Sequence, residues 1–144
     1  MKKELTEQLI ATILKLRKHV IAKNQMSKEQ RAATFLQFHA LRFLNENPKV
    51  TVGEFATDLC MSSAAIAQLI ERLQSNGWIV RENNDSDRRI IHLSLSDKGK
   101  KELSIMRLTF MDKVNSVLKF VSEDDVKELT RILNQILEGL NKND

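Results

Sequence analysis

Three consecutive charged side chains, Asp87, Arg88 and Arg89, span the end of a polar, turn-forming segment, residues 83–88, and the first position after it. Residues 89–95 follow with alternating apolar and polar side chains, which is typical of a half-buried β-strand. An exposed arginine at such a turn carries a flat, positive guanidinium that fits a narrow DNA minor groove, where negative potential is concentrated. The alternative is a solvated Asp87–Arg89 ion pair, which contributes little to stability. Arg88 is expected to contact phosphate or to face water.

The elements that would position this turn are a helix-turn-helix and a hairpin. Thr51-Val52-Gly53-Glu54 is a capping box that starts a first helix, and Cys60-Met61-Ser62 is a turn whose serine caps a second helix. Asn76-Gly77 ends the second helix, since glycine readily adopts a left-handed conformation. Residues 78–82 then pair with residues 89–95. This order predicts a winged helix, mainly α with a small β-hairpin wing, in which one helix enters the DNA major groove and the hairpin tip lies beside or in the minor groove.

The second helix of this pair has an apolar face, predicted to be buried, that carries Ile66, Leu69, Ile70 and Leu73. The candidate DNA-facing residues of the opposite side are Ser62, Ser63, Ala64, Ala67, Gln68 and Arg72. Glutamine can pair with adenine in a bidentate manner, and alanine can contact a thymine methyl group. Because most of these side chains are short, selectivity is also expected to depend on the wing and on DNA shape. Arg72 is expected to contact phosphate, or alternatively to pair with Glu71 or the wing.

Amphipathic helices are predicted on the N-terminal side of the winged helix. A helix from residue 3 to about residue 23 follows from apolar side chains at helical spacing, namely Leu5, Leu9, Ile13, Leu16 and Val20. Within residues 27–46, Ser27-Lys28-Glu29-Gln30 and Thr34-x-x-Gln37 are two candidate starts, so this segment forms either one helix or two. It is expected to stop near Asn47-Pro48, because residues before proline avoid the helical conformation.

Two further helices are predicted within residues 97–141, the first starting at Ser96-Asp97-Lys98-Gly99 and the second capped by Ser122. Their apolar stripes are Leu103, Met106, Phe110, Val114, Val117 and Val121, then Val126, Leu129, Leu133, Ile136 and Leu140. A winged helix alone cannot cover these stripes, so they predict a surface for partner helices. Dimerisation is favoured over an intramolecular bundle, because DNA readers of this class use two-fold symmetry to match paired half-sites.

Composition agrees with one helical domain over residues 1–144, with the winged helix at about 34–100 and the dimerisation helices at about 3–23 and 97–141. One proline and four glycines leave little room for loops, and a single cysteine fits a reducing cytoplasm. No apolar run is long enough for a membrane span or a signal peptide, so a cytoplasmic protein is expected. A net charge of +4 favours nucleic acid only weakly, because residues 61–100 are nearly neutral.

The order and spacing of the motifs resemble the MarR family of bacterial transcription regulators, closely over residues 30–102 and by pattern in the flanking helices. The matching positions are Thr34, Gln37, Leu41, Leu44, Glu54, Phe55, Ala56, Ser62, Glu71, Arg72, Leu73, Asn76, Gly77, Trp78, Ile79, Arg81, Asp87, Arg89, Leu95, Ser96 and Gly99. The resemblance implies a homodimeric regulator, usually a repressor, that binds a pseudo-palindromic duplex and is released by a small ligand or signal.

Residue roles follow from the same resemblance. Arg89 would enter the minor groove while Asp87 holds its guanidinium. A ligand pocket would lie where the dimer helices meet the winged lobe, and would involve His19, Phe38, Arg42, Met61 and Trp78. The chain departs from the family pattern at Ala67-Gln68, where members commonly carry Thr or Ser followed by Arg.

The other reactive side chains predict no cofactor, metal or catalytic site. Cys60 has no basic neighbour in sequence to activate its thiol, so it is predicted to be a small buried filler rather than an oxidant sensor. His19, His39 and His92 are scattered without ligand spacing, and a zinc site joining His19 and His39, as in some relatives, is the less favoured alternative. No Gly-rich phosphate loop, Ser/His/Asp order or paired carboxylates indicate an enzyme.

Two functions of different classes remain. The first is a sequence-specific, DNA-binding transcription regulator. The second is a winged-helix protein-interaction module without its own operator. This hypothesis remains because the outward face of the second helix is short and alanine-rich and because residues 61–100 are nearly neutral. Binding to DNA from the region upstream of the chain's own gene would separate them.

Overall fold

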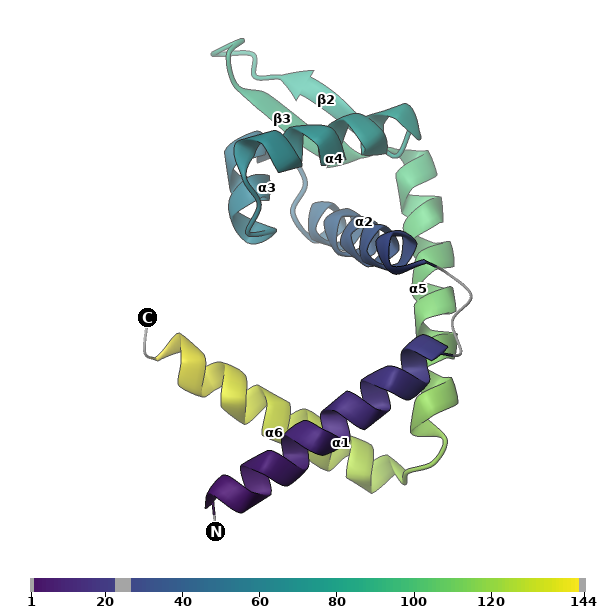
Figure 1. Ribbon diagram of the computed structural model, residues 1–144. Coiled ribbons are helices and arrows are strands. Elements are labelled where there is room, and N and C mark those ends of the chain that lie inside the picture. Colours follow the sequence, from purple (N-terminus) through teal and green to yellow (C-terminus); the bar gives the residue numbers. More distant parts are fainter. Residues whose placement is uncertain (1, 23–26, 143–144) are drawn as a thin grey trace. The chain divides into compact units, whose positions relative to one another are not determined.

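The computed structural model describes residues 2–22 and 27–142 (Figure 1). The chain divides into two compact units, one up to Gln37 and one from Phe38 onward, and each is considered by itself. Elements within the described residues are α1 (Lys2–Ala22), α2 (Lys28–Glu46), β1 (Val50–Thr51), α3 (Val52–Asp58), α4 (Ser63–Ser75), β2 (Ile79–Asn83), β3 (Ile91–Leu95), α5 (Asp97–Leu118) and α6 (Glu123–Asn141). The mainly α fold with a small β-hairpin wing is confirmed.

The first unit contains α1, whose apolar stripe Leu5, Leu9, Ile13, Leu16 and Val20 is exposed. The predicted helix end at about residue 23 lies just outside the described residues. None of the helices in the described ranges is both long and apolar enough to span a membrane.

A single helix, α2, occupies the segment in which the sequence left one helix or two open. The structure selects the start at Ser27, because Ser27 Oγ accepts from Gln30 N at 3.2 Å and Gln30 Oε1 accepts from Ser27 N at 2.9 Å. Thr34 starts no helix, since it lies inside α2 and its hydroxyl donates to the Gln30 carbonyl. The helix ends at Glu46, just before Asn47-Pro48 as predicted.

The helix-turn-helix forms as the capping residues indicate. Thr51 and Glu54 make a reciprocal capping box on α3, and Ser62 Oγ accepts from Ala65 N at the start of α4. The four apolar residues of α4 predicted to be inward are buried, namely Ile66, Leu69, Ile70 and Leu73. On α3 the predicted inward face is less deeply covered, since Phe55 is buried while Val52, Ala56 and Leu59 are half-buried.

Cys60 is exposed, so the prediction that it fills the core is wrong. The physical reason is its place immediately after α3, where φ is 50° and the chain reverses. Cys60 N donates to Thr57 O and Met61 N donates to Ala56 O, which is the Schellman arrangement that terminates helices. The left-handed residue in that arrangement lies outside the packed face. Gly77, with φ of 73°, occupies the equivalent place after α4.

The strands form an antiparallel sheet in the order β1-β3-β2, with Ile79 opposite Leu95 and Asn83 opposite Ile91. The short strand β1 was not predicted, and it makes β3 the central strand. Leu93 is therefore buried, and its neighbours in β3 are all half-buried instead of alternating as predicted. The tip also shifts, because Asn83 belongs to β2 and the connection runs over residues 84–90 rather than 83–88.

The start of α5 is fixed against the hairpin. Ser96 caps α5 by accepting from Gly99 N, its hydroxyl donates to Gly77 O at 2.6 Å, and its backbone N donates to Trp78 O. Gly99 is buried so close to Trp78 that an added Cβ would collide with the Trp78 carbonyl. Glycine is therefore required where α5 crosses the start of β2.

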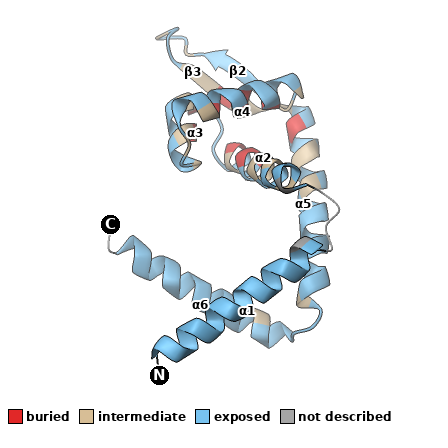
Figure 2. Cartoon of the chain, viewed as in Figure 1, coloured by how far each residue is buried: buried red, intermediate tan, exposed pale blue. Residues whose placement is uncertain are grey.

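The core of the second unit lies between α2, α3, α4 and the sheet. The buried apolar residues are Ala40, Leu41, Leu44, Val50, Phe55, Ile66, Leu69, Ile70, Leu73, Ile79 and Leu93. Phe43 of α2 stacks on Phe55 of α3 with ring centroids 5.9 Å apart. Most of α5 and all described residues of α6 contribute nothing to this core (Figure 2).

Candidate nucleic-acid interface

The outward face of α4 is exposed over its whole length. Every predicted contact residue on it is solvent-exposed, namely Ser62, Ser63, Ala64, Ala67, Gln68 and Arg72. The opposite face is held in the core, so the orientation of this surface about the helix axis is fixed. Its side chains are short apart from Gln68 and Arg72, and backbone atoms can therefore approach a groove closely.

Arg72 carries the positive charge of this face. Among the described residues it makes no ion pair, so neither Glu71 nor the wing neutralises it. Its guanidinium is exposed one helical turn beyond Gln68. Such a group can contact a phosphate while Gln68 reaches a base edge.

The wing tip places Arg89 outward on a turn that hydrogen bonds define. Asn84 N donates to Ile90 O at 2.9 Å, and Ile90 N donates to Asp87 O at 3.0 Å, which closes the loop. Asp87 Oδ1 accepts from Arg89 N at 3.0 Å and lies 3.6 Å from Arg89 Nε. The Arg89 side chain is 95% exposed and that of Asp87 46% exposed. Arg88 is also exposed.

The electrostatic strength of the Asp87–Arg89 pair is small, since exposed ion pairs contribute about 0–1 kcal/mol to stability. The guanidinium is therefore oriented but still available to an anion. Two exposed, positively charged side chains of this lobe, Arg72 on α4 and Arg89 on the wing, can each meet a negatively charged backbone or groove.

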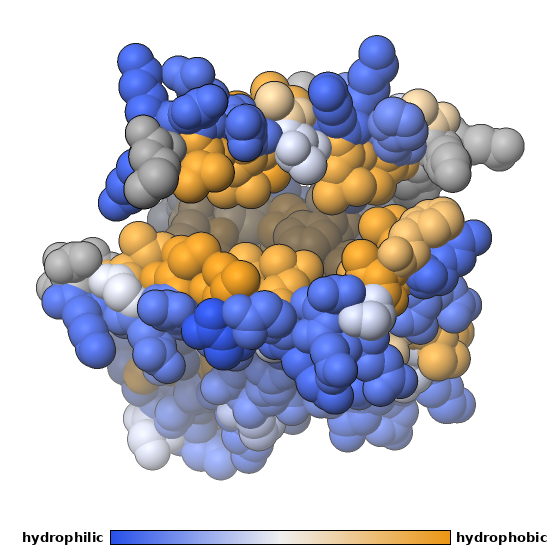
Figure 3. Space-filling model, turned by 90° about the horizontal axis from the view of Figure 1, so that it is seen from below, coloured by the Kyte–Doolittle hydropathy of each residue, from blue (hydrophilic) through white to orange (hydrophobic). Residues whose placement is uncertain are grey.

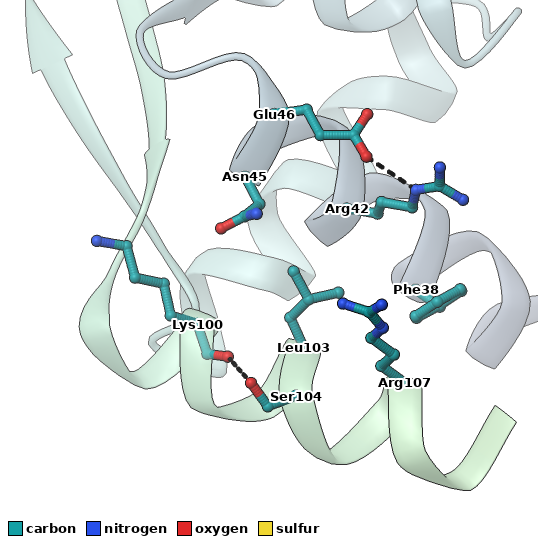
Figure 4. A pocket seen from close by; sticks show the side chains of 8 residues that line it. All are labelled: Phe38, Arg42, Asn45, Glu46, Lys100, Leu103, Ser104 and Arg107. Carbon is teal, nitrogen blue, oxygen red and sulfur yellow. Dashed lines mark hydrogen bonds and ion pairs between the residues drawn. The ribbon is translucent and has the colours of Figure 1, made fainter. Parts of the chain in front are cut away.

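A separate cavity of about 450 Å³ lies between α2 and α5 (Figure 4). Its lining residues are Phe38, Arg42, Asn45 and Glu46 from α2 with Lys100, Leu103, Ser104 and Arg107 from α5. Arg42 donates to Glu46 at 3.0 Å, and Phe38 stacks on Phe110 at 5.3 Å between centroids. The wall combines three basic side chains with one acidic and two apolar ones, and the acidic Glu46 is paired with the basic Arg42.

Two of the five predicted pocket residues, Phe38 and Arg42, line this cavity. Met61 and Trp78 are not among its lining residues, and His19 belongs to the other unit. Sequence reasoning missed the contribution of α5. The signal was present, because Lys100, Leu103, Ser104 and Arg107 recur at the spacing of one helix face.

The histidines make separate local contacts. His19 Nδ1 lies 3.0 Å from Lys15 O, and His39 Nε2 lies 3.4 Å from Asp58 Oδ2. His92 Nδ1 lies 2.8 Å from Lys49 O. No group of three or more potential metal ligands occurs in the described parts of the chain.

A helix-turn-helix with an exposed second helix, joined to a hairpin with an exposed arginine, defines a winged-helix DNA-binding fold. The family model for the MarR family matches residues 34–91. The HTH-type transcriptional regulator MgrA of Staphylococcus aureus is 30% identical over 112 residues, which cover 76% of this chain and 73% of that protein. The chain belongs to the MarR family and is a DNA-binding transcriptional regulator.

Solved structures show the same fold. The YusO protein from Bacillus subtilis matches with a TM-score of 0.73 and 22% identity, covering 96% of this chain and 98% of that one. The transcriptional regulator BldR from Sulfolobus solfataricus matches with a TM-score of 0.69 and 27% identity, again over 96% and 98% of the two chains. The flanking helices resemble the family only by pattern in the sequence. The structural matches, which cover 96% of this chain, include them.

Proposed function

We propose that the protein is a homodimeric repressor that binds a pseudo-palindromic operator and is released by a small effector. In this proposal α4 lies in the major groove, where Gln68 and Ala67 meet base edges and Arg72 meets phosphate. Arg89 enters the adjacent minor groove and Arg88 contacts phosphate. The observation that carries the proposal is the 95% exposure of an Arg89 side chain that Asp87 nevertheless orients.

The proposed dimer forms through helices α1, α5 and α6. The support is the apolar side chains that α6 leaves 40–60% exposed, namely Leu129, Ile132, Leu133, Ile136, Leu137 and Leu140. Figure 3 shows exposed apolar side chains lying beside hydrophilic ones. Large apolar side chains exposed along one helix, as on α6, mark a site of association. In this proposal the whole chain acts as one domain, with a winged lobe at about residues 34–100.

The proposed effector is a small anion with an apolar body that binds in the cavity between α2 and α5. Arg42, Lys100 and Arg107 supply positive charge, and Phe38 and Leu103 supply apolar contact. The cavity lies between α2, which precedes the helix-turn-helix, and α5, which follows the wing. An occupant can therefore favour a dimer in which the two α4 helices, one from each protomer, have a different spacing. A coupling of about 1–3 kcal/mol is typical and would lower operator affinity by about 5–150-fold.

A binding experiment tests the proposal. Fluorescence anisotropy at physiological salt would compare a duplex from the gene's own upstream region with a scrambled duplex of the same composition. A preference of about a thousandfold or more is expected for a specific operator complex. Equal, weak binding to both duplexes would favour the protein-interaction module, for which the short, alanine-rich face of α4 is the motivation.

A further inference from the structure

A hydrogen-bonded chain runs from the body of the winged lobe to the wing tip. His92 Nδ1 lies 2.8 Å from the Lys49 carbonyl oxygen, and His92 Nε2 lies 3.1 Å from Asn84 Nδ2. The Asn84 carboxamide oxygen accepts from Ser86 N at 2.8 Å and from Asp87 N at 3.3 Å. Two side chains, His92 and Asn84, therefore connect residues that are distant in sequence.

The donors and acceptors along this chain are mutually consistent for one protonation state. Ser86 N and Asp87 N are donors, so the atom of Asn84 that faces them is its oxygen, and its NH2 group faces His92. His92 Nε2 must then be an unprotonated acceptor. The Lys49 carbonyl can only accept, so His92 Nδ1 carries the proton. The network therefore places the hydrogen of the His92 ring on Nδ1 and leaves Nε2 as the acceptor.

The Lys49 end of this chain is rigidly held. Lys49 has φ of 61° where the chain turns from α2 into β1, and its backbone N donates to Ser94 Oγ at 3.3 Å. The next residues are paired to the central strand, with Val50 opposite Leu93 and Thr51 opposite His92. His92 is thus anchored to the part of the lobe that contains the buried core.

The wing-tip end leads directly to Arg89. Asn84 holds the backbone of Asp87, and the carboxylate of Asp87 accepts from Arg89 N and pairs with Arg89 Nε. Any rotation of the tip that breaks the Asn84 contacts must also displace Asp87. The orientation of the exposed arginine therefore depends on Asn84, and the orientation of Asn84 depends on His92.

We propose that His92 and Asn84 are positioning residues for DNA binding, which act through the wing tip on Arg89 and do not themselves contact DNA. The inference rests on the proposed role of Arg89. Holding the tip in its bound conformation before DNA arrives lowers the entropy lost on binding, so the network raises affinity without adding a contact.

A double-mutant cycle tests the positioning role through operator Kd values. Asn84→Ala and His92→Phe are each expected to weaken binding by about three- to tenfold, as for loss of one or two net hydrogen bonds. Asn83→Ala, which removes an exposed amide one residue earlier, is the matched control and should change Kd less than about twofold. In an Arg89→Ala background the effects of Asn84→Ala and His92→Phe should disappear, because there is no arginine left to position.

A pair of charge-matched variants gives a readout that general destabilisation would not produce. Asn84→Asp keeps an acceptor for Ser86 N and Asp87 N but turns a second acceptor toward His92 Nε2, which is itself an acceptor in the network. Asn83→Asp adds the same charge outside the network. Other titratable groups near His92, Glu82 opposite it on β2 and Lys49 beside it, are common to both variants. Asn84→Asp should therefore weaken operator binding more than Asn83→Asp does, although the two variants carry the same added charge.

Nitrogen NMR of the histidine ring in the intact protein supplies an independent measurement, in which His92 Nδ1 is expected to carry the proton that the Lys49 carbonyl accepts. A proton on Nε2, or equal losses from Asn84→Ala with and without Arg89, would overturn the positioning role while leaving the proposed function intact. If Arg89→Ala itself leaves operator binding unchanged, the wing is not part of the interface, so the positioning role and the wing's part in the proposed function both fall. Circular dichroism and thermal unfolding of each variant confirm that the comparisons involve folded protein.

Discussion

One carboxylate oxygen, Asp87 Oδ1, makes both contacts that join Asp87 to Arg89. It accepts from the Arg89 backbone N at 3.0 Å and lies 3.6 Å from the side-chain Nε. The shorter contact fixes the turn, and the longer one orients the guanidinium without a close hydrogen bond. The arginine is thereby directed outward while its remaining donors stay available.

Arg89→Ala is expected to weaken operator binding by about 1–3 kcal/mol per half-site, because a groove contact is lost and the exposed side chain leaves no cavity. Anisotropy titration measures the affinity, and sedimentation should show an unchanged assembly. Adding Asp87→Ala to this variant should change the affinity little or improve it slightly, since the aspartate acts through the arginine. Strictly additive losses would show that Asp87 does not position Arg89.

The salt dependence of binding reports the phosphate contacts. A winged-helix dimer that neutralises on the order of 6–10 phosphates should lose about 10³–10⁵ in affinity between 50 and 200 mM salt. Repeating the titration with Arg72→Ala should reduce the steepness of this dependence by about one phosphate contact per protomer. An affinity that does not change over this range would contradict the DNA interface altogether.

Leu133→Glu is expected to dissociate the proposed homodimer. Leu133 is 52% exposed on α6 and would be buried against a second chain, where an unpaired charge costs several kcal/mol. Sedimentation should then shift from the dimer to a 16.6 kDa monomer. Asn134→Glu is the matched control, since it adds the same charge next to the apolar stripe and should leave the dimer intact. A wild-type protein that is already monomeric at micromolar concentration would refute the dimer.

Gly99→Ala tests the close approach of α5 to β2. An added Cβ would collide with the Trp78 carbonyl. The free energy of unfolding should therefore fall by at least about 1–3 kcal/mol, the usual cost of overpacking. Gly53→Ala is the control, because its Cβ would meet only Thr51 Oγ1 at 4.0 Å. Denaturant unfolding of both variants measures the difference. Equal stability of the two would mean that α5 does not start against Trp78.

The cap of α6 is expected to weaken in acid. Hydrogen bonds from the Ser122 hydroxyl and then the Ser122 backbone N lower the pKa of Asp125 below its ordinary value, so the folded state favours the carboxylate. A depressed pKa stabilises the fold above the pKa of the unfolded chain, and this stability is lost as the pH falls through the folded value. In the Asp125→Asn variant, the helix content measured by circular dichroism should therefore fall less as the pH is lowered than it does in the wild type. An equal fall in the two proteins would show that the cap is not formed in solution.

Local sequence determined most of the helix boundaries and the inward face of α4. Thr51, Ser62, Ser96 and Ser122 each cap a helix where predicted, because a cap depends on residues only three positions apart. Gly77 ends α4 for an equally local reason, its freedom to take a positive φ. The order of these caps and of the helix-ending glycine along the chain was enough to predict a mainly α fold with a wing.

Tertiary structure decided the features that join distant segments. The contact of His92 with Lys49 spans 43 positions, and neither residue predicts the other. The unpredicted pairing of β1 with β3 makes β3 a central strand, which replaces the simple alternation of buried and exposed residues. The cavity required α5 to lie beside α2, because Lys100 and Arg107 line the same cavity as Arg42 only in the folded lobe. Local patterns specify how a segment folds, whereas the contacts of the wing and the cavity depend on which segments the core brings together.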